Sequence, residues 1–265
     1  VDAVQVDIFA GKGGKAVLGL GRDDFEVYDN GVLQQVELLR KETEPLSAFL
    51  VFDTSWSVQG EKLGHLKEAS RIFLDGMEPK DRAALLCFSS NLQLSSGLSV
   101  SSALKDVVDD IRAFGSTSLY DGLYAGLKMA ESSRRPLILL FTDGVDTFSW
   151  LSDFEVSLVV EESNAVIYVV STAPKETRVT WGTDPDTEFL RNAAAVSGGR
   201  YLHEETSSRL RSIFRDILNE MKTRYWISYI PMGVDEAGWH ELDIRVKRRG
   251  VDVIARRGYW RREKQ

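Results

Sequence analysis

Four short runs of uninterrupted apolar residues set the fold class of this chain. They occupy residues 48–52, 83–88, 137–141 and 165–170. A strand buried on both faces of a parallel sheet is apolar throughout, whereas a strand with one face in water alternates. Apolar residues between and after these runs recur at the i, i+3, i+4 spacing of amphipathic helices, most clearly in 206–223. The pattern predicts an α/β fold with a doubly wound, mainly parallel sheet flanked by helices.

The two ends of the chain follow a different pattern. Residues 1–45 and 223–265 contain alternating stretches such as Val4, Val6 and Ile8, and one of these stretches covers 251–259. They are separated by turns that include Asn-Gly, the strongest short hairpin signal. Neither end has enough strands to be stable alone. We therefore expect both ends to join into one small β-sheet or sandwich appended to an α/β domain at 46–222.

Two short stretches give further predictions, one at the start of the last helix and one in a glycine-rich stretch near the N-terminus. Thr206 or Ser207 is expected to cap the last helix, because their hydroxyl oxygens accept from free backbone N–H groups. The glycine-rich stretch 11–15 superficially resembles a phosphate-binding loop. It lacks the Gly-Lys-Ser/Thr ending of such a loop and precedes a strand-like stretch, so we interpret it as a hairpin turn.

Charge limits the partners. The formal net charge is -7, and an acidic chain is a poor nucleic-acid binder because phosphate contacts need a basic surface. Nine basic side chains nevertheless gather in residues 245–265. We interpret them as a solvated strand face beside N-terminal acids such as Asp23 and Asp24. The alternative is a patch that binds a polyanion or lipid headgroups, with membrane or cell-surface association.

The cysteine content, the hydropathy and the first residue give an expectation for the cellular location. The one cysteine, Cys87, lies in an apolar run and is expected to be a small core residue. No stretch reaches the roughly 18 apolar residues of a membrane-spanning helix. The chain begins with Val1 rather than Met. We therefore expect an extracytoplasmic protein, periplasmic or secreted, from which an N-terminal signal has been removed.

Polar side chains follow the buried runs where ligands bind in open α/β sheets, at the carboxyl ends of the strands. Asp53, Ser55 and Ser57 form an Asp-x-Ser-x-Ser loop after the first run, and Asp143 follows the third. Thr117 precedes a helix in Gly-Ser-Thr-Ser. These are hard oxygen ligands without His or Cys, so they favour Mg²⁺, or Mn²⁺ or Ca²⁺, over zinc. Two carboxylates leave part of the shell to water, which an outside carboxylate can replace.

These three stretches, in this order, resemble the metal-ion-dependent adhesion site of von Willebrand factor A domains. The resemblance covers residues 46–222, and all five metal-site positions match. It implies a Rossmann-like fold, a bound divalent metal, and a protein partner whose Asp or Glu completes the metal shell. The flanking stretches at 23–27 and 256–259 resemble a bacterial group of A-domain proteins common in Acidobacteria.

The function expected on this basis is divalent-metal-dependent protein binding, as an adhesion, interaction or assembly module, without enzymatic activity. Trp56, inside the metal loop, is expected to be either a core aromatic or an exposed partner contact. Ser116 and Ser118, on either side of Thr117, are further candidate partner contacts.

Two alternatives remain open. One is a metal-dependent hydrolase or phosphotransferase, although the sequence has no Gly-x-Ser-x-Gly and His65, His203 and His240 are expected to be structural. The other is a structural A domain whose metal is regulatory. The sequence does not decide the oligomeric state.

Overall fold

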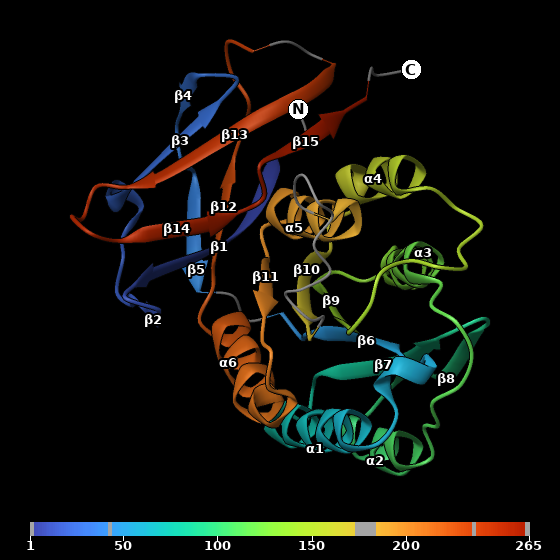
Figure 1. The fold of residues 1–265 in the computed structure, drawn as a ribbon. Coiled ribbons are helices and arrows are strands. Elements are labelled where there is room, and N and C mark those ends of the chain that lie inside the picture. The colour runs from blue at the N-terminus through green and yellow to red at the C-terminus, as the bar shows by residue number, and fades with distance from the viewer. Residues whose placement is uncertain (1–2, 42–43, 173–183, 235–236, 263–265) are drawn as a thin grey trace.

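The computed structural model describes residues 3–41, 44–172, 184–234 and 237–262. Two bodies of structure lie side by side (Figure 1). One contains a sheet flanked by helices, and the other consists of strands from both ends of the chain. No helix among the described residues is long and apolar enough to cross a membrane.

A six-stranded sheet in the order β11-β10-β9-β6-β7-β8 forms the centre of the α/β body. Its strands are β6 (Ser47–Asp53), β7 (Arg82–Phe88), β8 (Leu92–Ser99), β9 (Pro136–Thr142), β10 (Val166–Ser171) and β11 (Arg200–His203). The four apolar runs form the four inner strands, which are parallel to one another. Only β8, at one edge, pairs antiparallel. The predicted mainly parallel α/β fold is thus confirmed.

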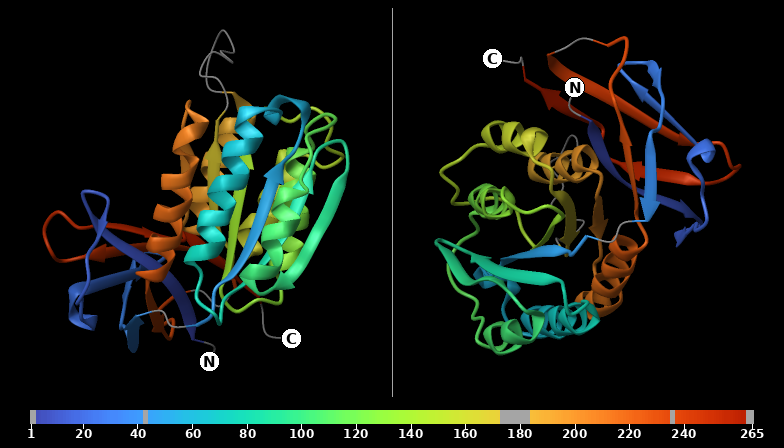
Figure 2. Two further views of the ribbon diagram at one scale, coloured as in Figure 1. Left: turned by 90° about the horizontal axis from the view of Figure 1, so that it is seen from below. Right: turned by 180° about the vertical axis from the view of Figure 1, so that it is seen from behind.

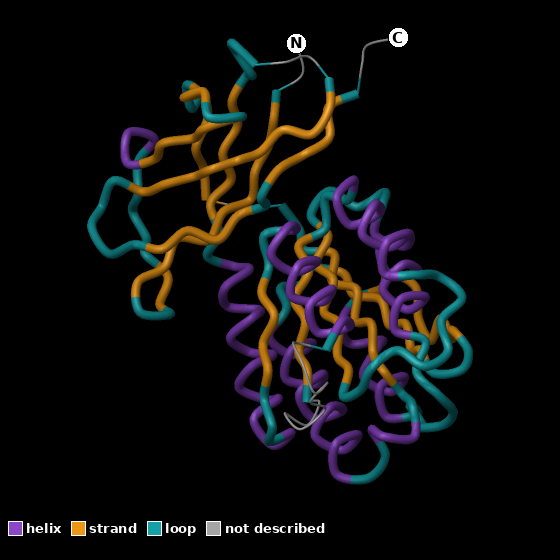
Figure 3. The backbone as a smooth tube through the Cα atoms, turned by 45° about the horizontal axis from the view of Figure 1, so that its top comes forward, coloured by secondary structure: helices purple, strands orange, loops and turns teal. Residues whose placement is uncertain are grey.

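Helices cover both faces of this sheet (Figure 3). They are α1 (Glu61–Gly76), α2 (Ser101–Asp109), α3 (Leu119–Ala130), α4 (Asp153–Glu162), α5 (Pro185–Ser197) and α6 (Leu210–Lys222). Successive residues of β6 face opposite cores. Leu50 and Phe52 pack with α1, α2 and α6, whereas Phe49 and Val51 pack with α3, α4 and α5. Burial on both faces explains why the residues between the ends of β6 are all apolar.

The start of α6 differs from the expectation. A 3₁₀ turn, η3 (Ser207–Arg209), precedes the helix, and Arg209 is its N-cap residue. Neither Thr206 nor Ser207 makes a side-chain cap hydrogen bond at this end. The Ser207 hydroxyl is instead paired with His65 Nδ1 of α1 at 2.8 Å, so it is not available to the backbone.

The all-β body contains two antiparallel sheets, ordered β14-β1-β12-β5, with β2 paired to β1, and β15-β13-β3-β4. The N-terminal strands are β1 (Val4–Lys12), β2 (Lys15–Ala16), β3 (Phe25–Asp29), β4 (Val32–Gln34) and β5 (Leu38–Lys41); the C-terminal ones are β12 (Tyr225–Tyr229), β13 (Gly238–Val246), β14 (Asp252–Ala255) and β15 (Gly258–Arg261). Both sheets combine strands from the two ends of the chain, as expected. They enclose a core of their own, which includes Ile8, Val27, Ile227 and Ile244.

Two turns of this body have the predicted form. Residues 11–15 connect β1 to β2 as a hairpin, not as a phosphate loop. Asn30 and Gly31 connect β3 to β4 with φ values of 46° and 79°. Both values lie in the left-handed region that favours asparagine and glycine, as the two-residue hairpin turn requires.

The single strand expected over 251–259 is wrong. The chain breaks at Arg256 and Arg257, so that β14 and β15 belong to different sheets. The Arg256 guanidinium donates to Asn164 Oδ1 at 2.9 Å, and the Arg257 N–H donates to the Val196 carbonyl at 3.0 Å. This segment therefore attaches the all-β body to the α/β body, a role that strand pairing would prevent.

The all-β body covers the amino ends of the central strands. In the left view of Figure 2 it lies at the opposite end of the sheet from the carboxyl ends. The loops that follow β6 and β9 are therefore left clear of it.

Candidate functional site

Asp53 is the last residue of β6 and is fully buried. Its Oδ1 accepts the Ser55 N–H at 2.9 Å, and its Oδ2 accepts the Thr142 hydroxyl at 2.8 Å. Burial raises the pKa of Asp53, while the hydrogen bonds from Ser55 and Thr142 oppose that rise. The carboxylate is thus held in one orientation from two neighbouring strand ends.

A continuous chain of oxygen atoms joins two of the predicted loops. Ser55 Oγ lies 2.9 Å from Ser57 Oγ, and the Ser57 hydroxyl donates to Asp143 Oδ1 at 2.6 Å. The loops after β6 and β9 therefore meet, as the sequence predicted.

Thr117 reaches the same place from the third loop. A Cβ built on Gly144 would lie 3.9 Å from Thr117 Oγ1 and 4.0 Å from Ser57 Oγ. The loop after β9 holds Thr117 in position, since the Thr147 and Phe148 N–H groups donate to its carbonyl at 2.9 and 3.0 Å. Side chains from three separate segments thus surround one point at the carboxyl end of the sheet.

A positive charge from α1 completes this arrangement. Lys62, in the first turn of the helix, forms an ion pair between its Nζ and Asp143 Oδ2. The ammonium group occupies a place on the carboxylate that a metal cation would also favour. Sequence reasoning missed Lys62. Its position five residues after Ser57, at the start of the helix that leaves the metal loop, was the available signal.

The donor set is made of oxygen alone. Within the described part of the chain, no group of three or more His, Cys, Asp or Glu side chains is placed to hold a metal. The set here has two carboxylates, and hydroxyl oxygens provide the rest. Such a set fits a hard cation with several water ligands and does not fit zinc.

The three candidate partner contacts differ in exposure. Trp56 is 59% exposed, which matches the interpretation as a surface contact beside the metal loop. Ser116 is also exposed. Ser118 is only 3% exposed, so its side chain is not accessible to a partner and that prediction is corrected. Trp150, which sequence reasoning did not identify, is 93% exposed in the loop after β9.

Two of the three histidines have partners away from the site. His65 Nδ1 pairs with the Ser207 hydroxyl, and His240 Nδ1 lies 2.7 Å from buried Asp29 Oδ1. Neither histidine therefore faces Ser55 or Ser57 as a base would. His203 ends β11, and its Nε2 is buried without a hydrogen-bond partner among the described residues.

Comparison with known proteins gives consistent results. The family described as the von Willebrand factor type A domain matches residues 49–216. Human inter-alpha-trypsin inhibitor heavy chain H4 is 26% identical over 214 residues, which are 73% of this chain and 22% of that protein. This chain therefore spans less than a quarter of the length of that relative.

Two solved structures share the fold. A von Willebrand factor type A protein from Catenulispora acidiphila superposes with a TM-score of 0.57 at 14% identity, covering 90% of this chain and 74% of the other. The pilus adhesin SpaC from Lactobacillus rhamnosus GG gives 0.57 at 11% identity, covering 92% of this chain and 49% of the other. The family match extends over more than half of the residues and includes all three site loops. The chain belongs to the von Willebrand factor type A domain family.

Proposed function

We propose that this chain is a divalent-metal-dependent protein-binding module in which an Asp or Glu of a protein partner completes the metal shell. The observation that carries the proposal is the contact chain from Ser55 Oγ through Ser57 Oγ to Asp143 Oδ1, at 2.9 and 2.6 Å. It brings oxygen atoms from two loops within contact distance of one another, as ligands of one shared metal ion must be.

Mg²⁺, or Mn²⁺ or Ca²⁺, would be held by Asp53, Ser55, Ser57, Thr117 and Asp143. The metal would supply the positive charge that an incoming carboxylate needs. The ion pair between Lys62 and Asp143 supports this assignment, because the Asp143 carboxylate is ionised and placed to pair with a positive charge. Exposed Trp56 and Trp150 provide aromatic surface beside the site for the partner's neighbouring side chains.

Family membership supports the binding role. Domains of this family mediate protein–protein interaction and adhesion, and one of the structural neighbours is a pilus adhesin. That neighbour also supports the proposal of an extracytoplasmic location. The acidic net charge of -7 supports a protein partner rather than a nucleic acid.

Calorimetric titration with Mg²⁺ and Mn²⁺ tests the metal site. We expect one site in the unmodified chain and none in Asp143→Ala. Ser57→Ala should bind about tenfold more weakly, because one hydroxyl ligand is lost. The matched control is Ser116→Ala, which removes an exposed hydroxyl next to Thr117 and should bind metal normally. Equal affinities for Ser57→Ala and Ser116→Ala would refute the ligand set.

Partner binding is tested next by capture of proteins from the native host on the immobilised chain. A protein retained in Mg²⁺ should be released by EDTA and should not bind Asp143→Ala. Retention that survives both treatments would place the interaction elsewhere. Metal-dependent turnover of a phosphoester or peptide would favour the enzyme alternative.

A further inference from the structure

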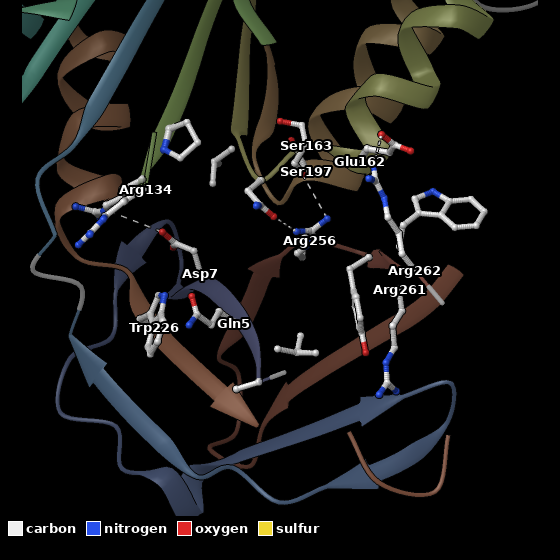
Figure 4. A pocket seen from close by; sticks show the side chains of 18 residues that line it. Gln5, Asp7, Arg134, Glu162, Ser163, Ser197, Trp226, Arg256, Arg261 and Arg262 are labelled. Atoms are coloured by element: carbon white, nitrogen blue, oxygen red, sulfur yellow. Dashed lines mark hydrogen bonds and ion pairs between the residues drawn. The ribbon is translucent and has the colours of Figure 1, made fainter. Parts of the chain in front are cut away.

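A cavity of about 590 Å³ lies where the two bodies of the molecule meet (Figure 4). Pro136 and Val166, the first residues of β9 and β10, form one side of it. Gln5 of β1 and Trp226 of β12 form another. The cavity is therefore at the amino end of the sheet, opposite the metal site. Its volume is within the range of about 300–1,000 Å³ that is typical of small-molecule sites.

The walls carry a surplus of positive charge in an otherwise acidic protein. Five arginines line the cavity against two acids. Arg135 Nε lies 3.9 Å from Asp7, which also pairs with fully buried Arg224, and Arg262 lies 3.4 Å from Glu162. Arg134 and Arg256 have no carboxylate partner among the described residues that line the cavity.

Arg256 shows this imbalance most clearly. Its Nε donates to the Gly258 carbonyl at 2.6 Å and its Nη1 to Asn164 Oδ1 at 2.9 Å. Its Nη2 lies 3.4 Å from the Glu161 and Ser163 carbonyls. All of these acceptors are neutral, and burial lowers the pKa of the guanidinium. A partly buried cation held only by neutral groups is stabilised when an anion binds beside it.

Two further wall groups are free to bind a ligand. The side chains of Arg134, just before β9, and Gln5 form no hydrogen bond or ion pair with any residue that the structure describes, and both residues are exposed. Neither side chain has to break an internal contact to reach a ligand. Together they offer a guanidinium fork and an amide at the cavity rim.

Aromatic side chains line part of the same wall. Trp226, Tyr259 and Trp260 all contribute. Other contacts hold two of them: Trp226 has the Arg40 guanidinium over its ring at 4.3 Å, and the Tyr259 hydroxyl donates to Asp29 at 2.8 Å. Rings that are already fixed lose little entropy when a flat ligand packs against them.

We propose that this cavity binds a small phosphate-bearing ligand with a ring, the phosphate held by wall arginines and the ring packed against wall aromatics. A phosphate monoester carries close to two negative charges and three acceptor oxygens, so it balances more than one guanidinium. A monocarboxylate carries one charge and suits this surplus less well. The phosphate group can come from a soluble metabolite or from a lipid headgroup. A cavity of this size favours the soluble form.

Calorimetry on the full chain tests the proposal, with phenyl phosphate as the probe. We expect saturable binding of one equivalent, tighter than that of inorganic phosphate, which lacks the ring, and of benzoate, which lacks the second charge. Arg134→Met should weaken phenyl phosphate binding by about tenfold. Arg245→Met is the matched control, because it removes an arginine that is exposed on β13 away from the cavity.

Two measurements keep the test independent of folding and of the metal site. Arg134 is exposed, so its substitution should leave the thermal midpoint unchanged. Asp143→Ala should bind phenyl phosphate normally, because Asp143 lies at the other end of the sheet. Equal affinity for Arg134→Met and Arg245→Met, or benzoate binding as tight as phenyl phosphate, would overturn the proposal. Co-sedimentation with phosphatidic acid vesicles without any phenyl phosphate binding would overturn it in favour of a membrane surface.

Discussion

Replacement of Arg224 by Met should destabilise the whole fold, because this side chain joins the two bodies. It is among the largest fully buried side chains. Its Nε pairs with Asp7 of β1, its Nη2 donates to the Gly198 carbonyl at 2.8 Å, and its Nη1 donates to the Tyr168 hydroxyl at 3.2 Å. Burial lowers the pKa of the guanidinium, but Asp7, Tyr168 and Glu220 more than reverse that effect, so it stays charged.

The size of the effect follows from what the substitution leaves behind. Methionine keeps much of the apolar volume of Arg224 but removes the charge next to Asp7 and Glu220, whose side chains are only 19% and 12% exposed. Breaking a buried ion pair on one side costs about 3–5 kcal/mol. Asp7 keeps some solvent, and Arg135 Nε lies 3.9 Å from its other oxygen. We therefore expect Arg224→Met to lower the free energy of unfolding by about 3 kcal/mol, the lower end of that range. This is a large share of the roughly 5–15 kcal/mol by which native proteins are typically stable.

Urea unfolding followed by circular dichroism and tryptophan fluorescence measures this change. The control is Arg245→Met, which breaks an exposed pair with Asp243, whose side chains are 62% and 50% exposed, and should cost at most about 1 kcal/mol. Adding Asp7→Leu to Arg224→Met should restore part of the loss, since the buried charge is then removed as well. Equal unfolding free energies for the two single arginine variants would refute the argument that the buried contacts of Arg224 stabilise the packing of the two bodies.

Three further predictions concern single positions. Lys62→Met should raise the affinity for Mg²⁺ in calorimetry, because the ammonium no longer competes for Asp143; unchanged affinity would contradict a shared site. Burial raises the pKa of Cys87 to about 11, so a thiol reagent should label native protein only slowly at neutral pH and quickly after unfolding. Because the folded-state pKa is the higher one, this group's contribution to stability is full below pH 9 and is lost as the pH rises towards 11, which urea midpoints across that range would reveal. Gly199→Ala should cost about 1–3 kcal/mol, because its Cβ would lie 2.0 Å from the Ile167 carbonyl oxygen, whereas Gly64→Ala, with open space on α1, should be neutral or stabilising in the same unfolding assay.

The parts of the fold that the sequence predicts are those set by local burial. The central residues of each inner strand are apolar because both faces are covered, so a run such as 48–52 can be recognised from the sequence alone. The two site carboxylates can be found in the same way, since Asp53 is the last residue of β6 and Asp143 directly follows β9. Helix α4 gives a weaker sequence signal than α6, because only Val156 and Val160 of its ten residues are buried.

Features that depend on distant segments were not visible in the pattern. The strand break at Arg256 is caused by acceptors at 161–164, about ninety residues away in sequence. Lys62 was missed because its partner Asp143 is 81 residues away, and a lysine at the start of a helix does not by itself indicate that partner. Alternation in 251–259 indicated which residues were buried but did not indicate that they faced two different sheets.

The cavity also changes how the charge of this chain should be interpreted. A net charge of -7 argues against binding an extended polyanion, because a polymer contacts a wide area of the surface and is repelled by its overall negative charge. It does not argue against a small anion, which meets only the local field of the cavity wall. Arg248, in the turn after β13, lies 3.6 Å from Asp24, which agrees with the expectation that basic residues of 245–265 lie beside N-terminal acids. Arg256, Arg261 and Arg262 instead line the space that the all-β body closes against the sheet. Burial removes water and screening from the Arg256 guanidinium, so it acts more strongly on an anion than the same group on an open face.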